Sequence, residues 1–349
     1  MFSNIGKLNE YWHVIALERE LRPGHSIKRK LYGVPLLIWR DHRGQVFAIQ
    51  DCCAHRRAPL QVKDFSTNQI VCPYHGWEYS SRGQLLNVPS DSLATDKLKC
   101  SVPSYPTIEE SGFIWLFPNS NDVPPLSPRP DLSNYRTWTS NFKSQEFRTS
   151  VDLLVDNFMD PTHTALVHDG LIRKSSQIAE HEMLVLTNDS GVKVEYKEQI
   201  EQVGLGMRFL FGKTMRTQHS DEFLAPNLVR VIYRLNGIER FVALIACTPN
   251  IQAGQAKDAR TLALVQLRYN FGKLTFLLKP FISWLAGKVL KQDLEITENQ
   301  WANQQVFTQQ KEHHVAADAV AARVTRFRKQ LMAGQLPTES SEQLLKLNF

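Results

Sequence analysis

The sequence is poor in cysteine and has no long uninterrupted hydrophobic run. Its five cysteines are too few and too odd in number for a disulfide framework, so we expect a reducing compartment, the cytoplasm. The first twenty residues lack the basic start and cleavage site of a secretory signal, and no export is expected. The most apolar segment, 271–290, is interrupted by Lys273, Lys279, Pro280 and Lys288. It therefore predicts a core-facing helix rather than a membrane span of about 20 residues, with an amphipathic helix lying on a membrane as the alternative.

The sequence also lacks a basic block and a complete dinucleotide-binding fingerprint. The net charge of +6 comes from 41 basic and 35 acidic residues spread along the chain, so nucleic-acid binding is not expected. Gly204-Leu205-Gly206 is not followed by the third glycine of a G-x-G-x-x-G motif. The sequence therefore does not indicate a dinucleotide-binding domain.

Short apolar runs separated by turn residues indicate a first domain made of antiparallel strands, between about residues 12 and 117. A Pro-rich segment at 122–133 indicates the boundary to a second domain. We place the first domain at 1–138 and the second at 139–349. This length is sufficient for two domains with their own cores.

The second domain combines helix and strand patterns. Residues 150–168 are helical in parts, and the stretches 181–189, 192–200 and 202–212 have the composition or alternation of strands. The apolar face of 202–212 suits either a core or a substrate pocket. A last helix, ended by Gly334, is indicated by the spacing of Val320, Val324, Phe327 and Leu331. The sequence thus predicts an α+β fold.

Two short segments each supply one cysteine and one histidine, C-A-H at 53–55 and C-P-Y-H at 72–75. In a Rieske [2Fe-2S] cluster two thiolates hold one iron and two neutral imidazoles hold the other. A zinc site is the alternative, but zinc fingers usually place both cysteines before both histidines. The pattern favours a Rieske cluster bound by Cys53, His55, Cys72 and His75.

The surroundings of these ligands indicate the type of cluster. Gly76 lets the backbone approach the cluster, and Trp77 is expected to shield it from water. Respiratory Rieske proteins resemble this pattern but add a cysteine to each loop, where this chain has Ala58 and Tyr74. The resemblance favours the low-potential branch that delivers electrons to an oxygen-activating site.

A second constellation contains two histidines, His163 and His168, behind a carboxylate. Five residues rotate a helical side chain by about 140°, so one ion can be shared only if the segment bends, which Pro161 favours. Two imidazoles and one carboxylate leave positions open on Fe(II) for O2. Surface or core roles rather than ligation are expected for the isolated histidines His13, His25, His42, His181 and His219.

Together with the cluster motif, the pattern from Asp156 to His168 resembles that of the Rieske non-haem iron oxygenases of the large-subunit type. The resemblance covers nearly the whole chain. It implies an all-β Rieske domain followed by a helix-grip-like catalytic domain, with His163 and His168 as ligands of a mononuclear iron. It also implies that Asp160 bridges a cluster histidine of one subunit to an iron histidine of the next, and therefore a homotrimer.

The resemblance further implies a third iron ligand, a carboxylate near the start of a late helix. Asp293 fits the family motif at this point, and Glu295 and Glu298 are the alternatives.

The function implied is that of a terminal oxygenase component. It would use O2 and electrons from NAD(P)H, delivered by a separate flavin reductase or plant-type ferredoxin that docks near His55 and His75. An aromatic or polycyclic small molecule would be hydroxylated, by mono- or dioxygenation, or oxidatively demethylated. The compact chain favours the demethylase and monooxygenase members, and residues 281–293 are similar to the pheophorbide-oxygenase-like branch. A Rieske electron carrier or redox sensor with a degenerate second metal site is the alternative.

Overall fold

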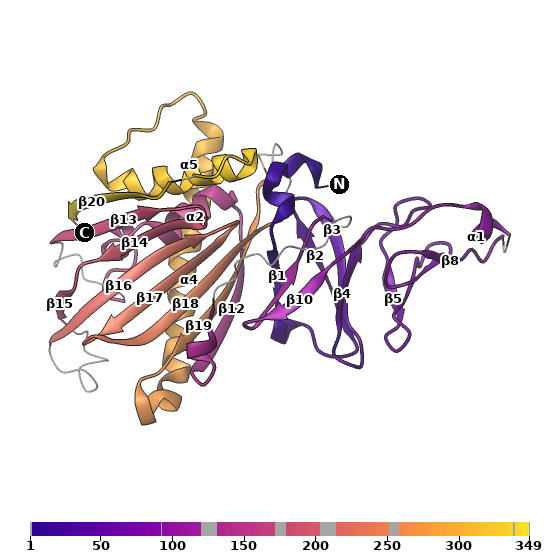
Figure 1. The fold of residues 1–349 in the computed structure, drawn as a ribbon, viewed down its shortest axis with the longest axis horizontal. Coiled ribbons are helices and arrows are strands. Elements are labelled where there is room, and N and C mark those ends of the chain that lie inside the picture. Colours follow the sequence, from indigo (N-terminus) through magenta and orange to yellow (C-terminus); the bar gives the residue numbers. More distant parts are fainter. Residues whose placement is uncertain are drawn as a thin grey trace. The chain divides into compact units, whose positions relative to one another are not determined.

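The structure is a computed structural model that divides into two compact units (Figure 1). The first unit comprises Met1–Ser127 with Thr248–Gln255, and the second comprises Pro128–Cys247 with Ala256–Phe349. The structure describes residues 2–91, 93–119, 131–171, 179–202, 214–250, 258–337 and 339–348. The predicted strand at 202–212 and the Pro-rich boundary segment lie almost entirely outside the described residues.

In its described residues the first unit contains three small antiparallel sheets, with the strand orders β1-β11-β10, β2-β3-β4-β9 and β5-β6-β7-β8. Three of the short apolar runs of this region, at 34–41, 46–51 and 112–119, contain β3, β4 and β11. The predicted all-β architecture is confirmed. The elements are η1 (Ser3–Glu10), β1 (His13–Leu17), η2 (Glu18–Glu20), β2 (His25–Leu31), β3 (Val34–Arg40), β4 (Val46–Gln50), β5 (Gln61–Asp64), β6 (Gln69–Val71), β7 (Glu78–Tyr79), β8 (Leu85–Asn87), α1 (Ala94–Lys97), β9 (Ser104–Tyr105), β10 (Thr107–Glu110) and β11 (Phe113–Leu116).

Among the described residues, the second unit is a nine-stranded antiparallel sheet with the order β12-β19-β18-β17-β16-β14-β13-β20, in which β15 also pairs with β16. The stretch expected as a strand at 181–189 forms β13, and the stretch at 192–200 forms β14 and the start of β15. The strands are β12 (Thr139–Phe147), β13 (Glu180–Thr187), β14 (Gly191–Tyr196), β15 (Gln199–Gln202), β16 (Thr214–Leu224), β17 (Leu228–Leu235), β18 (Ile238–Pro249), β19 (Thr261–Tyr269) and β20 (Ser341–Asn348).

The helices pack against this sheet, which agrees with the predicted combination of an antiparallel sheet and helices. The longest, α4, packs against β12 and α2, and α5 packs against β14 and α2 (Figure 1). The last helix ends where predicted, because Gly334 adopts the left-handed φ of 71° that glycine accepts readily. The remaining elements are η3 (Ser133–Tyr135), α2 (Val151–Met159), η4 (Thr162–Ala165), η8 (Gly272–Leu274), α4 (Thr275–Val306), η9 (Ala316–Asp318) and α5 (Ala319–Ala333).

The apolar segment 271–290 forms the start of α4 and is only partly core-facing. Leu278 and Ile282 are buried, whereas Phe276 and Trp284 are 68% and 52% exposed. No helix in the described part of the chain is both long enough and apolar enough to cross a membrane. The prediction of a core-facing helix therefore holds for one side of the segment.

Candidate metal centres and substrate cavity

The two cysteine-histidine segments lie on loops of the first unit, after β4 and after β6. The thiols of Cys53 and Cys72 are each 1% exposed and belong to the hydrophobic cluster beneath these loops. His55 is exposed and His75 partly buried, with their ring centroids 4.8 Å apart. Sulfur donors on the buried side and imidazoles on the outer side match the two unlike ends of a Rieske cluster. These residues fit the group.

Gly76 and Trp77, which follow the second ligand segment, shape its loop and cover one of its histidine partners. Gly76 has a φ of 72° and donates its amide to the Cys72 carbonyl at 2.9 Å, and a Cβ there would lie 3.0 Å from Pro89 Cγ. Trp77 is buried and its ring stacks on His55 with centroids 4.8 Å apart. The turn therefore requires glycine, and the indole covers one imidazole, as the sequence led us to expect.

Hydrogen bonds reach both cysteine sulfurs. The Tyr79 hydroxyl lies 3.1 Å from Cys53 Sγ and also accepts the Ala54 amide at 3.2 Å. Burial raises the pKa of the Cys72 thiol, and backbone hydrogen bonds from Tyr74 and His75 oppose that rise. Tyr79 was missed because its position on β7, two residues after Trp77, indicates only that it alternates into the core.

Replacing Tyr79 with phenylalanine is expected to lower the reduction potential of the cluster without loss of iron or sulfide. A hydrogen bond contributes about 1 kcal/mol net, which for one electron corresponds to about 40 mV. A redox titration followed by electron paramagnetic resonance measures the shift. Tyr105→Phe is the matched control, because that buried hydroxyl makes no hydrogen bond within the described residues. Equal potentials for the two variants would contradict a role for the Tyr79 hydroxyl.

The two histidines of the second constellation come together outside any regular α-helix. Helix α2 is capped by Ser150, whose hydroxyl accepts the Leu153 amide at 3.2 Å, and it ends at Met159. The 3-10 turn η4 then carries His163, and the following turn carries His168, with ring centroids 5.1 Å apart. The interruption lies where Pro161 favours one: Asp160 is extended after α2, and Pro161 is the N-cap residue of η4, so the two histidines do not share one regular helix.

Asp293 of α4 completes this constellation. Its Oδ1 lies 3.1 Å from His168 Nε2 and 3.6 Å from His163 Nε2. One donor atom from each of the three residues lies within 4.8 Å of the others, and both His168 and Asp293 are 1% exposed. These separations suit nitrogen and oxygen ligands held at about 2 Å from one first-row metal ion.

The two alternative carboxylates lie elsewhere on α4. Glu295 forms an exposed ion pair with Lys291 at 3.7 Å, and Glu298 accepts the Arg148 amide at 2.8 Å. The structure thus brings only Asp293, of the three candidates, to the histidines.

Polar neighbours orient the three side chains. Asn157 donates to Asp293 Oδ1 at 3.0 Å, and Gln292 Oε1 lies 2.9 Å from His168 Nδ1. On the other side, Asp160 Oδ2 lies 3.7 Å from His163 Nδ1. Because the Nδ1 atoms face these groups, both Nε2 atoms are directed at Asp293. The contact of Gln292 with His168 was not predicted, although the position of Gln292 next to Asp293 could have indicated it.

The electrostatics match a site for a cation. Burial raises the pKa of Asp293, but its contacts with His163 and His168 outweigh this and hold the pKa at about 2. Burial lowers the pKa of His163, but the carboxylates of Asp160 and Asp293 beside it raise the pKa to about 9. Asp293 therefore remains a carboxylate, and positive charge between these groups is stabilised. The donor set fits a mononuclear iron.

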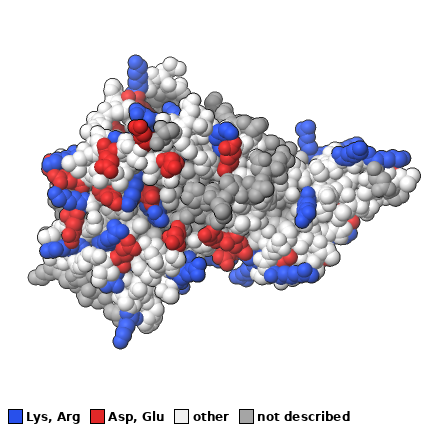
Figure 2. All heavy atoms as spheres, viewed as in Figure 1, with Lys and Arg blue, Asp and Glu red and all other residues white. Residues whose placement is uncertain are grey.

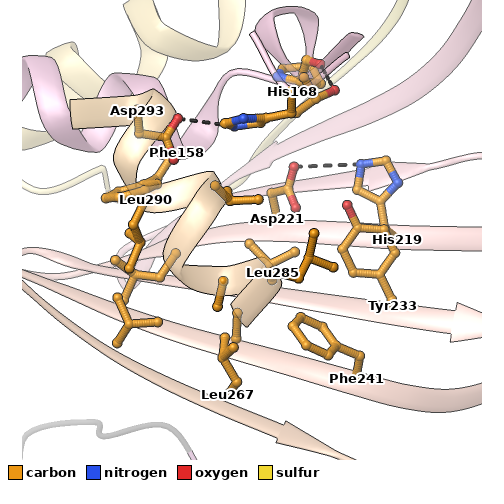
Figure 3. A pocket seen from close by; sticks show the side chains of 18 of the residues that line it. Phe158, His168, His219, Asp221, Tyr233, Phe241, Leu267, Leu285, Leu290 and Asp293 are labelled. Atoms are coloured by element: carbon orange, nitrogen blue, oxygen red, sulfur yellow. Dashed lines mark hydrogen bonds and ion pairs between the residues drawn. The ribbon is translucent and has the colours of Figure 1, made fainter. Parts of the chain in front are cut away.

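A cavity of about 270 Å³ adjoins the triad (Figure 3). Its walls are mainly apolar side chains of the sheet and of α4, and Asp293 and His168 lie at one end. His219 and Asp221 of β16 add a polar patch. His219 was expected to be an isolated surface or core residue; it is buried but lines this cavity, and the H-x-D spacing on a strand was the available signal. The apolar lining comprises Phe158, Val231, Phe241, Ala243, Ile245, Val265, Leu267, Ile282, Leu285, Ala286, Val289 and Leu290.

Two family models match the sequence. A Rieske [2Fe-2S] domain matches residues 11–106, and the vanillate O-demethylase oxygenase C-terminal domain matches residues 147–334, which is more than half of the chain. The chain belongs to this family of Rieske oxygenases. The membership predicted from the motifs is confirmed, and the predicted cofactors, a [2Fe-2S] cluster and a mononuclear iron, are those of the family.

Individual relatives are distant. The chain is 30% identical over 168 residues to chlorophyllide a oxygenase of Arabidopsis thaliana, a match covering 48% of this chain and 30% of that protein. It is 25% identical over 233 residues to the vanillate O-demethylase oxygenase subunit of Pseudomonas sp., covering 65% and 57%. The matches thus span less than two thirds of the relatives' lengths.

A solved structure supports the fold over nearly the whole chain. Dicamba monooxygenase bound to 3,6-dichlorosalicylic acid has a TM-score of 0.74 at 22% identity, covering 93% of this chain and 97% of that one. The predicted arrangement of a β-rich Rieske domain followed by an antiparallel sheet with helices is confirmed.

Proposed function

We propose that this chain is the terminal oxygenase component of a multi-component system that hydroxylates or oxidatively demethylates an aromatic or polycyclic small molecule. O2 would be the co-substrate. The observation that carries the proposal is the buried His163–His168–Asp293 triad at the end of an apolar cavity, in a chain that also has a Rieske domain. In this proposal Cys53, His55, Cys72 and His75 hold the cluster.

The protein residues around the triad would orient the iron ligands and the substrate. The iron, when bound by His163, His168 and Asp293, supplies activation of O2 with electrons from the cluster. Asn157 and Gln292 keep two of these ligands oriented. The apolar walls exclude water from the site and direct substrate toward the open side of the triad, which limits unproductive loss of reduced oxygen.

An electron route between subunits is supported by Asp160. Its Oδ1 accepts hydrogen bonds from the Thr162 amide at 2.8 Å and hydroxyl at 2.7 Å, so Oδ2 remains directed toward His163. Its side chain is partly exposed, and in the first unit His55 is exposed as well. We propose that Asp160 meets a cluster histidine of a neighbouring copy, which makes the active form a homotrimer.

An Asp160→Asn variant is expected to keep both metal sites and to transfer electrons at least about tenfold more slowly, because an amide cannot hold the two imidazoles in the same protonation state. After anaerobic reduction, the visible absorption of the cluster is followed on mixing with O2. His163→Ala supplies the background rate, and Asp189→Asn, on an exposed turn, is the matched control. A rate equal to that of the wild type would rule out the bridge, and a monomeric mass by light scattering would contradict the trimer.

The electron donor is proposed to be a separate reductase or ferredoxin with an acidic surface. Lys and Arg side chains gather over the part of the first unit that carries α1 and β8 (Figure 2). Arg56 and Arg57 directly follow His55 and are exposed. Opposite charge speeds encounter between proteins, so the rate of cluster reduction should fall as salt is added. Further exposed basic residues of this unit are Lys63, Arg82, Lys97 and Lys99.

Metal counting separates the proposed function from that of an electron carrier. An oxygenase should hold about three irons and two acid-labile sulfides per chain after anaerobic reconstitution. Two irons and two sulfides would instead identify an electron-transfer or redox-sensing protein with a degenerate second site. The reducing, cytoplasmic location stays a prediction.

A further inference from the structure

A buried polar pair interrupts the apolar wall of the cavity. His219 and Asp221 of β16 are 7% and 6% exposed, and both line the same cavity as the triad. Their side chains face the same way because residues two apart on a strand share a face. Figure 3 shows the pair on the sheet, with Asp293 and His168 at the end of the cavity.

The strand register explains why the polar group sits at this place. On β17, Tyr233 lies opposite His219 and Val231 lies opposite Asp221. On β18, Phe241 and Ala243 follow in register and are apolar. Among the described strands that line the cavity, β16 therefore contributes both charged side chains, and a substrate enters an apolar slot with one polar edge.

The pair is held rigidly. The imidazole of His219 is stacked between two tyrosine rings, Tyr196 at 3.7 Å and Tyr233 at 5.1 Å, both nearly parallel to it. His219 Nε2 lies 3.8 Å from Asp221 Oδ2, which is an ion-pair distance but longer than a hydrogen bond. A preorganised pair of this kind binds a ligand without ordering its own side chains first.

We propose that His219 and Asp221 bind a hydroxyl group of the substrate, and that the substrate is otherwise apolar and uncharged; this rests on the proposed function. A hydroxyl both donates and accepts, so one hydroxyl can hydrogen-bond to the Asp221 carboxylate and to an imidazole N–H together. A carboxylate or sulfonate substrate would instead place a second anion beside Asp221 where little water screens it. The pair thus selects hydroxylated, otherwise apolar molecules against aromatic acids.

Equilibrium dialysis of the full iron-loaded protein with three matched probes tests the inference without turnover. Wild type is expected to bind 2-naphthol at least tenfold more tightly than naphthalene and than 2-naphthoate. Asp221→Asn should reduce the preference for 2-naphthol over 2-naphthoate severalfold. Glu222→Gln is the matched control, because Glu222 is adjacent on β16 but faces away and pairs with Arg230; its selectivity should equal that of the wild type.

Two outcomes would overturn the inference. One is wild-type binding of 2-naphthoate or naphthalene as tightly as 2-naphthol, a result that needs no variant to fold. The other is an unchanged ratio in Asp221→Asn with iron content and circular dichroism intact. Iron content distinguishes failure of this inference from failure of the proposed function. Three irons per chain with the wrong selectivity would refute only the substrate class. A missing third iron would refute the assignment as an oxygenase.

Discussion

Replacing His163 with alanine is expected to remove one iron per chain and to reduce O2-dependent oxidation to less than about one hundredth of the wild-type rate. Loss of one of three proposed ligands leaves only His168 and Asp293, which is too few for tight binding of Fe(II). The cluster should be unaffected, because its four proposed ligands belong to the other unit. Its visible spectrum and sulfide content should equal those of the wild type.

Iron and sulfide analysis, together with the cluster spectrum, checks this expectation. His313→Ala is the matched control, because His313 is an exposed histidine in the segment between α4 and η9. It should retain about three irons. If His163→Ala also retained about three irons and the full rate, the assignment of His163 as a ligand would be wrong.

Replacing Cys72 with serine is expected to have an equally large effect on the other centre. The thiol lies in the core beneath the ligand loops, and a serine hydroxyl does not ionise to give the soft anionic ligand that iron-sulfur clusters require. Both sulfides and two irons should fall to less than about one tenth of the wild-type content. Mononuclear iron should remain, since the triad lies in the second unit.

Cys100→Ser is the matched control for this variant. Cys100 packs against the same hydrophobic cluster, so the control reproduces the change of sulfur to oxygen without touching a proposed ligand. Cluster content by visible absorption and sulfide assay should be close to that of the wild type for Cys100→Ser. Equal loss in both variants would mean that the core, rather than ligation, had been disrupted.

Two features of the fold could be predicted because they depend on neighbouring residues. Strands such as β3 and β4 follow from short apolar runs ended by turn residues, and the helix α5 follows from its apolar spacing and Gly334. The cluster motif is equally local, because each loop carries its own cysteine and histidine within a few residues. The interruption after α2 is local as well, because a proline disfavours helical backbone at the residue before it, here Asp160.

What the sequence by itself determined is the chemistry of the two centres: which thiols, imidazoles and carboxylates are available, and that they match the Rieske oxygenases. Only the tertiary structure decided which distant groups meet. It brought Asp293, and neither Glu295 nor Glu298, to the histidines, and it placed His219 and Asp221 in the wall of the cavity. These contacts join residues far apart in the chain, and their geometry depends on helix packing and strand register, which no local pattern of residues encodes.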